Sequence, residues 1–460
     1  MESTLESNRH ATLLLDLAAN EMSPMTASVT CVSELLDGPI HGLVDFKIDM
    51  QELREAYDAI WPANRQSPSR RGPAHLLDPI KDLGGRLFNA LFQNDIGYAY
   101  RACVSAAEER NVRLRLCISC PTQTNLEELP WEFLYDPLRN DFVALSSRRA
   151  VVRQLMRPGM SGPLTLESLR VAFIASPDPS KRLELDRDRQ LLQAMVKAHP
   201  QRFSVEDLGD ATPRTLREAV SSGDYDIVHF SGKGIDLQPS DDRSRQALVV
   251  QGEKEADLLL PEVLRTATLS PLNGIRLLFL SACNTHRFAD RVASFIPNVI
   301  GMRGLVSVDF CVTFTSEFYR AVLAGVSIEE AVTAARVASD AVNPGGREWG
   351  MATLCTSAQG PAHLLGSALL PSKVLIEQMS SPAIVDPDRE REWRKLAQHL
   401  EVHRRNSDAL QKVLDNLTNT EGTAEAVRTI SQGSVEEVRQ KISTLHKSIS
   451  EIQSRMRLLQ

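Results

Sequence analysis

Two short motifs in the middle of the chain carry residue types suited to peptide-bond cleavage. They are Ser281-Ala282-Cys283 and Gly232-Lys233-Gly234, and each follows an apolar run typical of a buried strand. Ligands bind at the carboxyl ends of the strands in an open parallel sheet, so we expect the two motifs to meet across a crevice. A cysteine peptidase needs a thiolate there, together with a base and backbone N–H groups that stabilise the oxyanion.

The elements that must position these motifs form a repeating pattern between residues 168 and 357. Runs that are apolar on both faces, with amphipathic segments between them, are typical of a parallel sheet covered by helices. Thr212-Pro213 predicts the beginning of one helix, and Ala324-Gly325 predicts a break between two others. We therefore predict a doubly wound α/β domain. Its strands are expected at residues 169–175, 203–208, 225–230, 275–282, 299–302 and 352–355.

The preceding half of the chain predicts a further α/β part. Apolar and polar residues alternate over 112–118, as in a half-buried strand, and residues 142–145 with Val151-Val152 indicate another strand pair. We divide the chain into an N-terminal α/β part, a core domain and a helical tail. These cover residues 1–158, 159–372 and 380–460.

The tail ends in a helix with a continuous apolar seam. A capping box at Ser434 and Glu437 begins it, and apolar residues follow at spacings of three and four. The seam residues are Val435, Val438, Ile442, Leu445, Ile449, Ile452, Met456 and Leu459. A hairpin within one chain and a coiled coil between chains both satisfy this pattern. We predict self-association through this helix.

Charge and composition argue against several classes of function. The chain has 52 basic and 59 acidic residues, a net charge of −7, so the basic surface of a nucleic-acid or anionic-lipid binder is missing. We expect no membrane span and no secretory signal, because no run approaches 18 apolar residues and the N-terminus is acidic. The seven scattered cysteines are typical of reduced thiols, so we expect a cytoplasmic protein.

The sequence motifs do not predict a metal or cofactor site. Cys117 and Cys120 are spaced as C-x-x-C, but on a strand their thiols point to opposite faces, and no second ligand pair follows. Neither of the two glycine-rich phosphate-binding motifs, G-x-x-x-x-G-K-[ST] and G-x-G-x-x-G, occurs in the sequence. We therefore expect no metal and no cofactor.

The chain resembles the CHAT family, the caspase-like bacterial cysteine proteases related to separase. The resemblance is carried by residues 168–357 with the two motifs above. It continues upstream in residues 129–136 (LPWEFLYD) and Val151-Val152-Arg153, and downstream in residues 318–336. It implies a caspase-like six-stranded, mostly parallel sheet flanked by helices. An N-terminal α/β half would precede this core.

The same resemblance implies roles for individual residues. Cys283 corresponds to the nucleophile, and the backbone N–H groups of Gly234 and Cys283 to the oxyanion donors. Asp309, in the segment after the next strand, is a candidate for lining the substrate pocket. The family base is the second histidine of His-Phe-Ser-Gly-His-Gly, and Lys233 occupies that position here.

This replacement puts catalysis in doubt. A free lysine has a pKa near 10.4, so only about one in 2,500 is neutral at pH 7. His229 lies four residues earlier, about 13 Å along an extended strand, and we interpret it as a packed core histidine. His286 follows Cys283 by three residues and is a fallback base, although we expect it on a helix or turn that faces away.

We interpret the chain as a pseudopeptidase of a bacterial defence or programmed-cell-death system. In this interpretation it keeps its thiol, has lost its base, and acts by binding a protein partner. That partner would be a protease, sensor or substrate encoded nearby. The alternative is a cysteine endopeptidase, active alone or activated by a partner. A third possibility is that Cys283 has another role.

Overall fold

The computed structural model describes most of the chain before residue 366 and isolated positions beyond it. The described residues are 10–20, 23–46, 79–121, 124–155, 166–176, 182–237, 246–252, 256–265, 275–343, 347–358, 360–365, 440, 443–444 and 447–448. The chain divides into two compact units, Met1–Ala368 and Leu369–Gln460. The fold and site described below belong to the first unit. The eight predicted seam residues, 435 to 459, lie outside the described residues.

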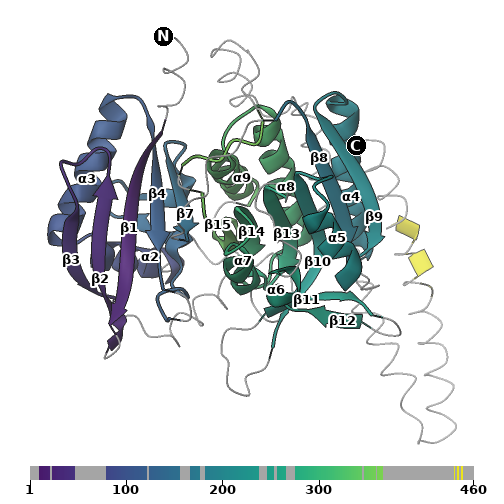
Figure 1. Cartoon of the computed structure of the whole chain (residues 1–460), viewed down its shortest axis with the longest axis horizontal. Helices are drawn as coiled ribbons and strands as arrows, with labels where there is room; N and C mark the ends of the chain where they lie inside the picture. The colour runs from purple at the N-terminus through teal and green to yellow at the C-terminus, as the bar shows by residue number, and fades with distance from the viewer. Residues whose placement is uncertain are drawn as a thin grey trace, which may run out of the picture. The chain divides into compact units, whose positions relative to one another are not determined.

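A single mixed sheet runs through the whole first unit (Figure 1). Over the described ranges it contains 13 strands. Eleven follow one another in the order β12-β11-β10-β13-β14-β15-β7-β4-β1-β2-β3, β8 also pairs with β10, and β9 pairs with β8. The strands are β1 (His10–Asn20), β2 (Ser23–Ser33), β3 (Ile40–Asp45), β4 (Arg113–Ser119), β7 (Arg149–Gln154), β8 (Leu169–Ala175), β9 (Phe203–Asp210), β10 (Ile227–Asp236), β11 (Gln246–Gln251), β12 (Ala256–Leu259), β13 (Leu277–Cys283), β14 (Asn298–Met302) and β15 (Ala352–Thr356).

Six of these strands form the sheet that the resemblance implied. β9, β8, β10, β13 and β14 are parallel, and β15 pairs with β14 in the antiparallel direction. Each predicted run coincides with one strand, so this prediction is confirmed. β10 continues beyond the predicted run to Asp236, because its far end pairs with β11, and Lys233 therefore lies on a strand rather than in a loop.

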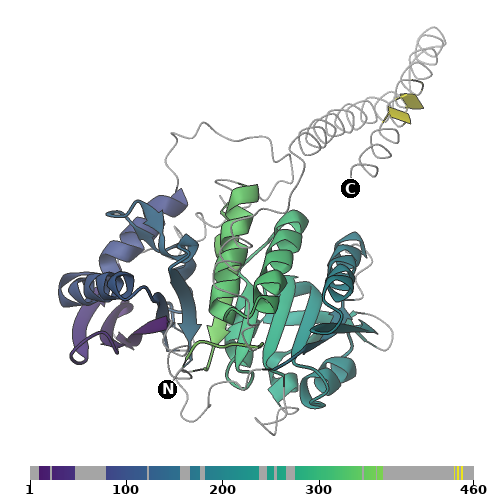
Figure 2. The same cartoon turned by 90° about the horizontal axis from the view of Figure 1, so that it is seen from above.

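Helices cover both faces of this six-stranded part (Figure 2). Alternate side chains of each strand enter two separate apolar cores, one beneath α4, α8 and α9 and the other beneath α5, α6 and α7. This is why the runs are apolar on both faces. The helices are α4 (Arg182–Ala198), α5 (Pro213–Ser221), α6 (Pro261–Arg265), α7 (His286–Val292), α8 (Val308–Leu323) and α9 (Ile328–Val342).

The helix signals predicted at Thr212-Pro213 and Ala324-Gly325 are confirmed, whereas the capping box predicted at Ser434 and Glu437 lies outside the described residues. Thr212 caps α5 by accepting a hydrogen bond from the backbone N–H of Thr215. Gly325 has a positive φ of 85° and separates α8 from α9, and Ser327 and Glu330 then form a capping box at the beginning of α9. Over the described ranges, we find no helix with the length and apolar character needed to cross a membrane.

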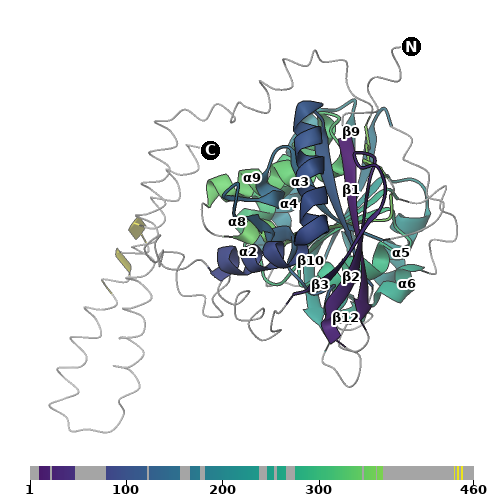
Figure 3. The same cartoon turned by 90° about the vertical axis from the view of Figure 1, so that its left-hand side faces the viewer.

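The N-terminal strands extend the same sheet across the predicted boundary at residue 158. β7 pairs with β15 on one side and with β4 on the other, and β1, β2 and β3 follow. Helices α2 (Pro79–Leu91) and α3 (Asn94–Glu109) pack beside these strands (Figure 3). The N-terminal part and the caspase-like part therefore share one continuous sheet.

Two local predictions in this half were wrong. β4 is buried on both faces. Helix α3 packs against it, and its Arg115 is paired with Glu329 of α9 at 2.9 Å. Residues 142–145 do not form a strand that pairs with β7. Asp141–Phe142 forms a short ladder with Tyr135–Asp136, and Val143–Leu145 is a turn of 3₁₀-helix.

Candidate active site

Cys283 is the last residue of β13, at the carboxyl edge of the sheet. Its half-buried sulfur accepts a hydrogen bond from the N–H of Val306 at 3.4 Å and contacts the Val306 carbonyl oxygen at 3.8 Å. Asn284 follows in a left-handed conformation, with φ 53°, and its N–H donates to the carbonyl of Gly304. The chain therefore turns sharply after the thiol and holds it against the segment that leads into α8.

Lys233 lies beside Cys283 on the neighbouring strand. The two are register partners in the parallel pair of β10 and β13, so their side chains leave the same face of the sheet on strands about 4.8 Å apart. Lys233 is exposed, and the described residues give it no hydrogen bond or ion pair. The position that carries the family base thus lies next to the thiol, but an exposed lysine side chain occupies it.

Gly234 brings β10 against the turn that follows Cys283. A Cβ atom at this glycine would lie 2.6 Å from the carbonyl oxygens of Cys283 and Asn284, so only glycine allows this approach. The two backbone segments expected to donate to an oxyanion are therefore adjacent.

His229 is packed in the core, one layer behind the crevice. Its side chain is fully buried and stacks on Phe279, with the ring centroids 4.7 Å apart. Its Nδ1 lies 3.1 Å from the hydroxyl of Tyr319, and its Nε2 lies 3.7 Å from a carboxylate oxygen of Asp188.

His286 begins α7 and is turned toward Glu128 rather than toward the thiol. Its Nε2 lies 3.8 Å from the Glu128 carboxylate, which also binds Arg287 at 2.7 Å and Arg303 at 3.7 Å. Burial, followed by the charge of Arg303, lowers the pKa of His286. Burial alone would raise the pKa of Glu128, but the adjacent His286 ring and the nearby arginines hold it well below its usual range.

Asp309 is not part of the lining of the cavity beside Cys283. It lies in the first turn of α8, its side chain is 86% exposed, and it pairs with Arg187 of α4 at 3.1 Å. The acidic side chain at the cavity beside Cys283 is instead Asp188, also from α4, which accepts a hydrogen bond from the Ser231 hydroxyl at 2.5 Å.

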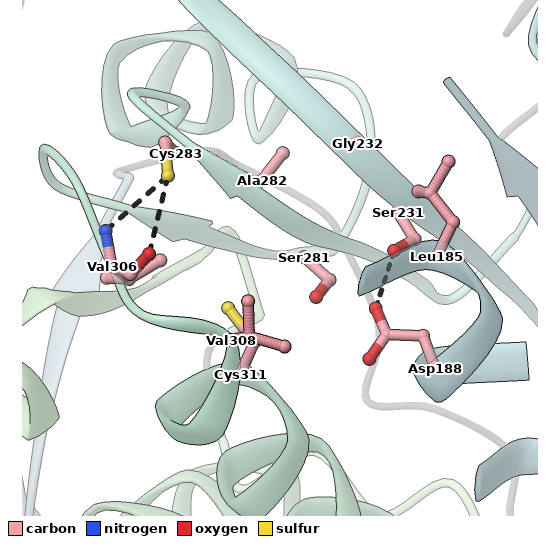
Figure 4. Close-up of a pocket in the computed structure, with 10 residues that line it drawn as sticks. All are labelled: Leu185, Asp188, Ser231, Gly232, Ser281, Ala282, Cys283, Val306, Val308 and Cys311. Carbon is pink, nitrogen blue, oxygen red and sulfur yellow. Dashed lines mark hydrogen bonds between the residues drawn. The ribbon is translucent and has the colours of Figure 1, made fainter. Parts of the chain in front are cut away.

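The cavity itself is small (Figure 4). Its volume is about 20 Å³, enough for one or two water molecules. It is lined by Leu185, Asp188, Ser231, Gly232, Ser281, Ala282, Cys283, Val306, Val308 and Cys311. Sequence reasoning missed Asp188 and Cys311, because both reach the cavity only through the packing of α4 and α8 on the sheet. Ser281 lies within one motif and Ser231 directly precedes the other, and their positions two residues before Cys283 and Lys233 place them on the same faces as those residues.

The comparison with protein-family models gives one match. The model described as "CHAT domain" matches residues 81–341, more than half of the 460-residue chain. The chain belongs to the CHAT domain family. The search of curated proteins finds no match.

Solved structures with a similar arrangement include two separase–securin complexes from Saccharomyces cerevisiae. The alignment with the 2.6 Å complex has 12% identity and a TM-score of 0.41, and it covers 79% of this chain and 31% of that chain. The alignment with the 3.0 Å complex has 11% identity and a TM-score of 0.40, and it covers 76% of this chain and 30% of that chain. The alignment with the complex of Porphyromonas gingivalis RgpB pro- and mature domains has 11% identity and a TM-score of 0.37, and it covers 60% of this chain and 71% of that chain. The chain thus spans about a third of the separase chains that it matches.

The crevice beside Cys283 holds some of the groups that the family resemblance implied. The thiol, a neighbouring cation and two closely packed backbone segments are in place. In the described part of the chain, the hydrogen bonds of the Cys283 sulfur go to the backbone of Val306 and not to an imidazole.

Proposed function

We propose that this CHAT-domain protein is a pseudopeptidase that binds a protein partner. The observation that carries the proposal is the register of β10 and β13, which puts Lys233 rather than a histidine beside Cys283. An exposed lysine lacks the desolvation that favours a neutral amine, so it is a poor general base.

The positions of the other histidines support the proposal. His229 is enclosed by aromatic side chains, and His286 is turned toward Glu128. Moving the His229 ring to the sulfur would break its contact with the Tyr319 hydroxyl and leave that buried group without this partner.

We further propose that the protein works in a bacterial defence or cell-death system and that its partner is encoded nearby. The resemblance to CHAT proteases supports this setting, since proteolysis in that family is typically triggered by a sensor or partner. Here the crevice would engage the partner without cleaving it. The alternative is that partner binding activates cleavage.

Substitution of Cys283 tests this proposal. The native chain and the Cys283→Ala variant are each incubated with the proteins that co-purify with the native chain, and new N-termini are identified by mass spectrometry. We expect the same partner to be retained by both chains and no cleavage that depends on Cys283. Cys311→Ala, in the same cavity, is the matched control. Cleavage by the native chain that is lost only in Cys283→Ala would establish the active peptidase instead.

We also propose that the C-terminal helix mediates self-association. Replacing Ile442 and Ile449 with aspartate places two charges in the predicted seam, so an assembly detected by light scattering should dissociate to monomers. Aspartate at Ser443 and Thr444, both exposed, is the matched control and should leave the mass unchanged. A native monomer, or an unchanged mass in the Ile442/Ile449 variant, would contradict this proposal.

A further inference from the structure

The cavity beside Cys283 contains a second thiol. Cys283, at the end of β13, and Cys311, near the beginning of α8, both line it, and both are half-buried. Figure 4 shows their sulfur atoms on the same side of the sheet, with Val306 and Val308 alongside. The two thiols are close enough to interact electrostatically.

The surroundings of the two thiols differ in a way that suits a two-step oxidation. The sulfur of Cys283 accepts the Val306 N–H, and the ammonium group of Lys233 leaves the same face of the sheet at the paired position. The sulfur that would react first therefore has a backbone N–H donor and a basic side chain as neighbours. Burial, followed by the charges of Asp188 and Cys283, raises the pKa of the Cys311 thiol well above its usual value. Cys311 therefore remains protonated while Cys283 reacts.

We propose that Cys283 and Cys311 form a reversible disulfide when the protein is exposed to hydrogen peroxide. In the first step the Cys283 sulfur attacks one peroxide oxygen, the O–O bond breaks, and a sulfenic acid and one water are produced. In the second step the sulfur of Cys311 attacks the sulfenic sulfur. The S–S bond forms as the S–O bond breaks, and the departing hydroxide takes the Cys311 proton as a second water.

The first step also removes an obstacle to the second. The negative charge of Cys283 is one cause of the raised pKa of Cys311, and it disappears once the sulfur is a sulfenic acid. The resulting disulfide would occupy the cavity and consume the thiol at the crevice. This inference is independent of the proposed function, because it needs only the two thiols and not the fate of a peptide.

A second cysteine pair in the chain provides an internal control. Cys31 of β2 and Cys103 of α3 interact with each other, but both are fully buried. Burial, with a smaller contribution from Cys103, raises the pKa of Cys31 to about 12. We expect this pair to stay reduced under conditions in which Cys283 and Cys311 react.

Peptide mapping of the full chain tests the proposal. The protein is treated with equimolar hydrogen peroxide, free thiols are alkylated in denaturant, and the digest is analysed without reductant. We expect the Cys283 and Cys311 peptides to be joined with the loss of two hydrogens, to separate after dithiothreitol, and to be the main cross-linked species. Cys31 and Cys103 should be recovered alkylated.

Two variants separate the steps. In Cys311→Ser the oxidation should stop at a Cys283 sulfenic acid that dimedone traps, and in Cys283→Ser the Cys311 thiol should be recovered alkylated. Circular dichroism establishes that each variant is folded. The proposal is wrong if peroxide converts native Cys283 to a sulfenic or sulfinic acid while Cys311 stays free. It is equally wrong if both thiols survive equimolar peroxide.

Discussion

Replacing Lys233 with histidine should create a peptidase or raise its rate by about 10² to 10⁴, the usual contribution of a general acid–base group. The substitution puts an imidazole at the register partner of Cys283, on the same face and about one strand spacing away. The rest of the site, including the close packing of Gly234 on the turn after Cys283, is unchanged. The rate is measured on a mixed peptide library by mass spectrometry.

Three control variants make this result interpretable. Lys233→Ala should not gain activity, because it removes the cation without supplying a base. Lys233→His combined with Cys283→Ala should be inactive, because the nucleophile is missing. Lys233→Gln tests whether loss of charge alone has an effect. If the native chain already cleaves peptides and Lys233→Ala abolishes that cleavage, lysine is the base and the pseudopeptidase proposal is wrong.

The core of this fold could be predicted because its signals are local. A strand that is buried on both faces is a continuous apolar run, and each of the six runs became a strand. The break between α8 and α9 was predictable in the same way, because Gly325 and the capping box at Ser327 act within a few residues.

Features that depend on distant pairing could not be predicted. Arg115 alternates with apolar residues as an exposed side chain would, but its partner Glu329 lies 214 positions later in the sequence. The joining of β7 to β15 likewise depends on residues about 200 positions apart. In the site, the two motifs predicted the positions of Cys283 and Lys233. Asp188 could not be predicted, because it reaches the cavity only through the packing of α4 over Ser231.

The structure also explains part of the sequence resemblance outside the crevice. Glu132, from the segment LPWEFLYD, and Arg153, from Val151-Val152-Arg153, form a buried bidentate ion pair with both N–O distances at 2.8 Å. Arg153 also donates to the backbone carbonyls of Glu127 and Leu129. These residues therefore hold the segment before the core against β7 and are not part of the catalytic machinery.

Replacing Arg153 with methionine should lower the free energy of unfolding by about 3–5 kcal/mol, because it leaves the Glu132 carboxylate buried without its partner. Denaturant unfolding followed by circular dichroism measures this loss. Glu132→Gln in the Arg153→Met background should recover part of it, since the uncompensated charge is removed. Arg214→Met, at an exposed ion pair with Glu218, is the control and should change stability by less than about 1 kcal/mol.

The pH dependence of the same variant distinguishes a lost ion pair from lost packing. In the native chain burial alone would raise the pKa of Glu132, but Arg153 lowers it to about 2. The unfolded value is about 4.3, so this contribution is complete above that pH and is lost as the pH falls toward 2. In Arg153→Met the charges of Arg303 and Arg336 remain, but the charge that opposes burial most strongly is gone, so the carboxyl binds a proton more readily in the folded state. The loss in free energy of unfolding caused by Arg153→Met should therefore be largest near pH 7 and become smaller toward pH 5. A loss that is the same at both pH values would mean that packing, and not charge, accounts for it.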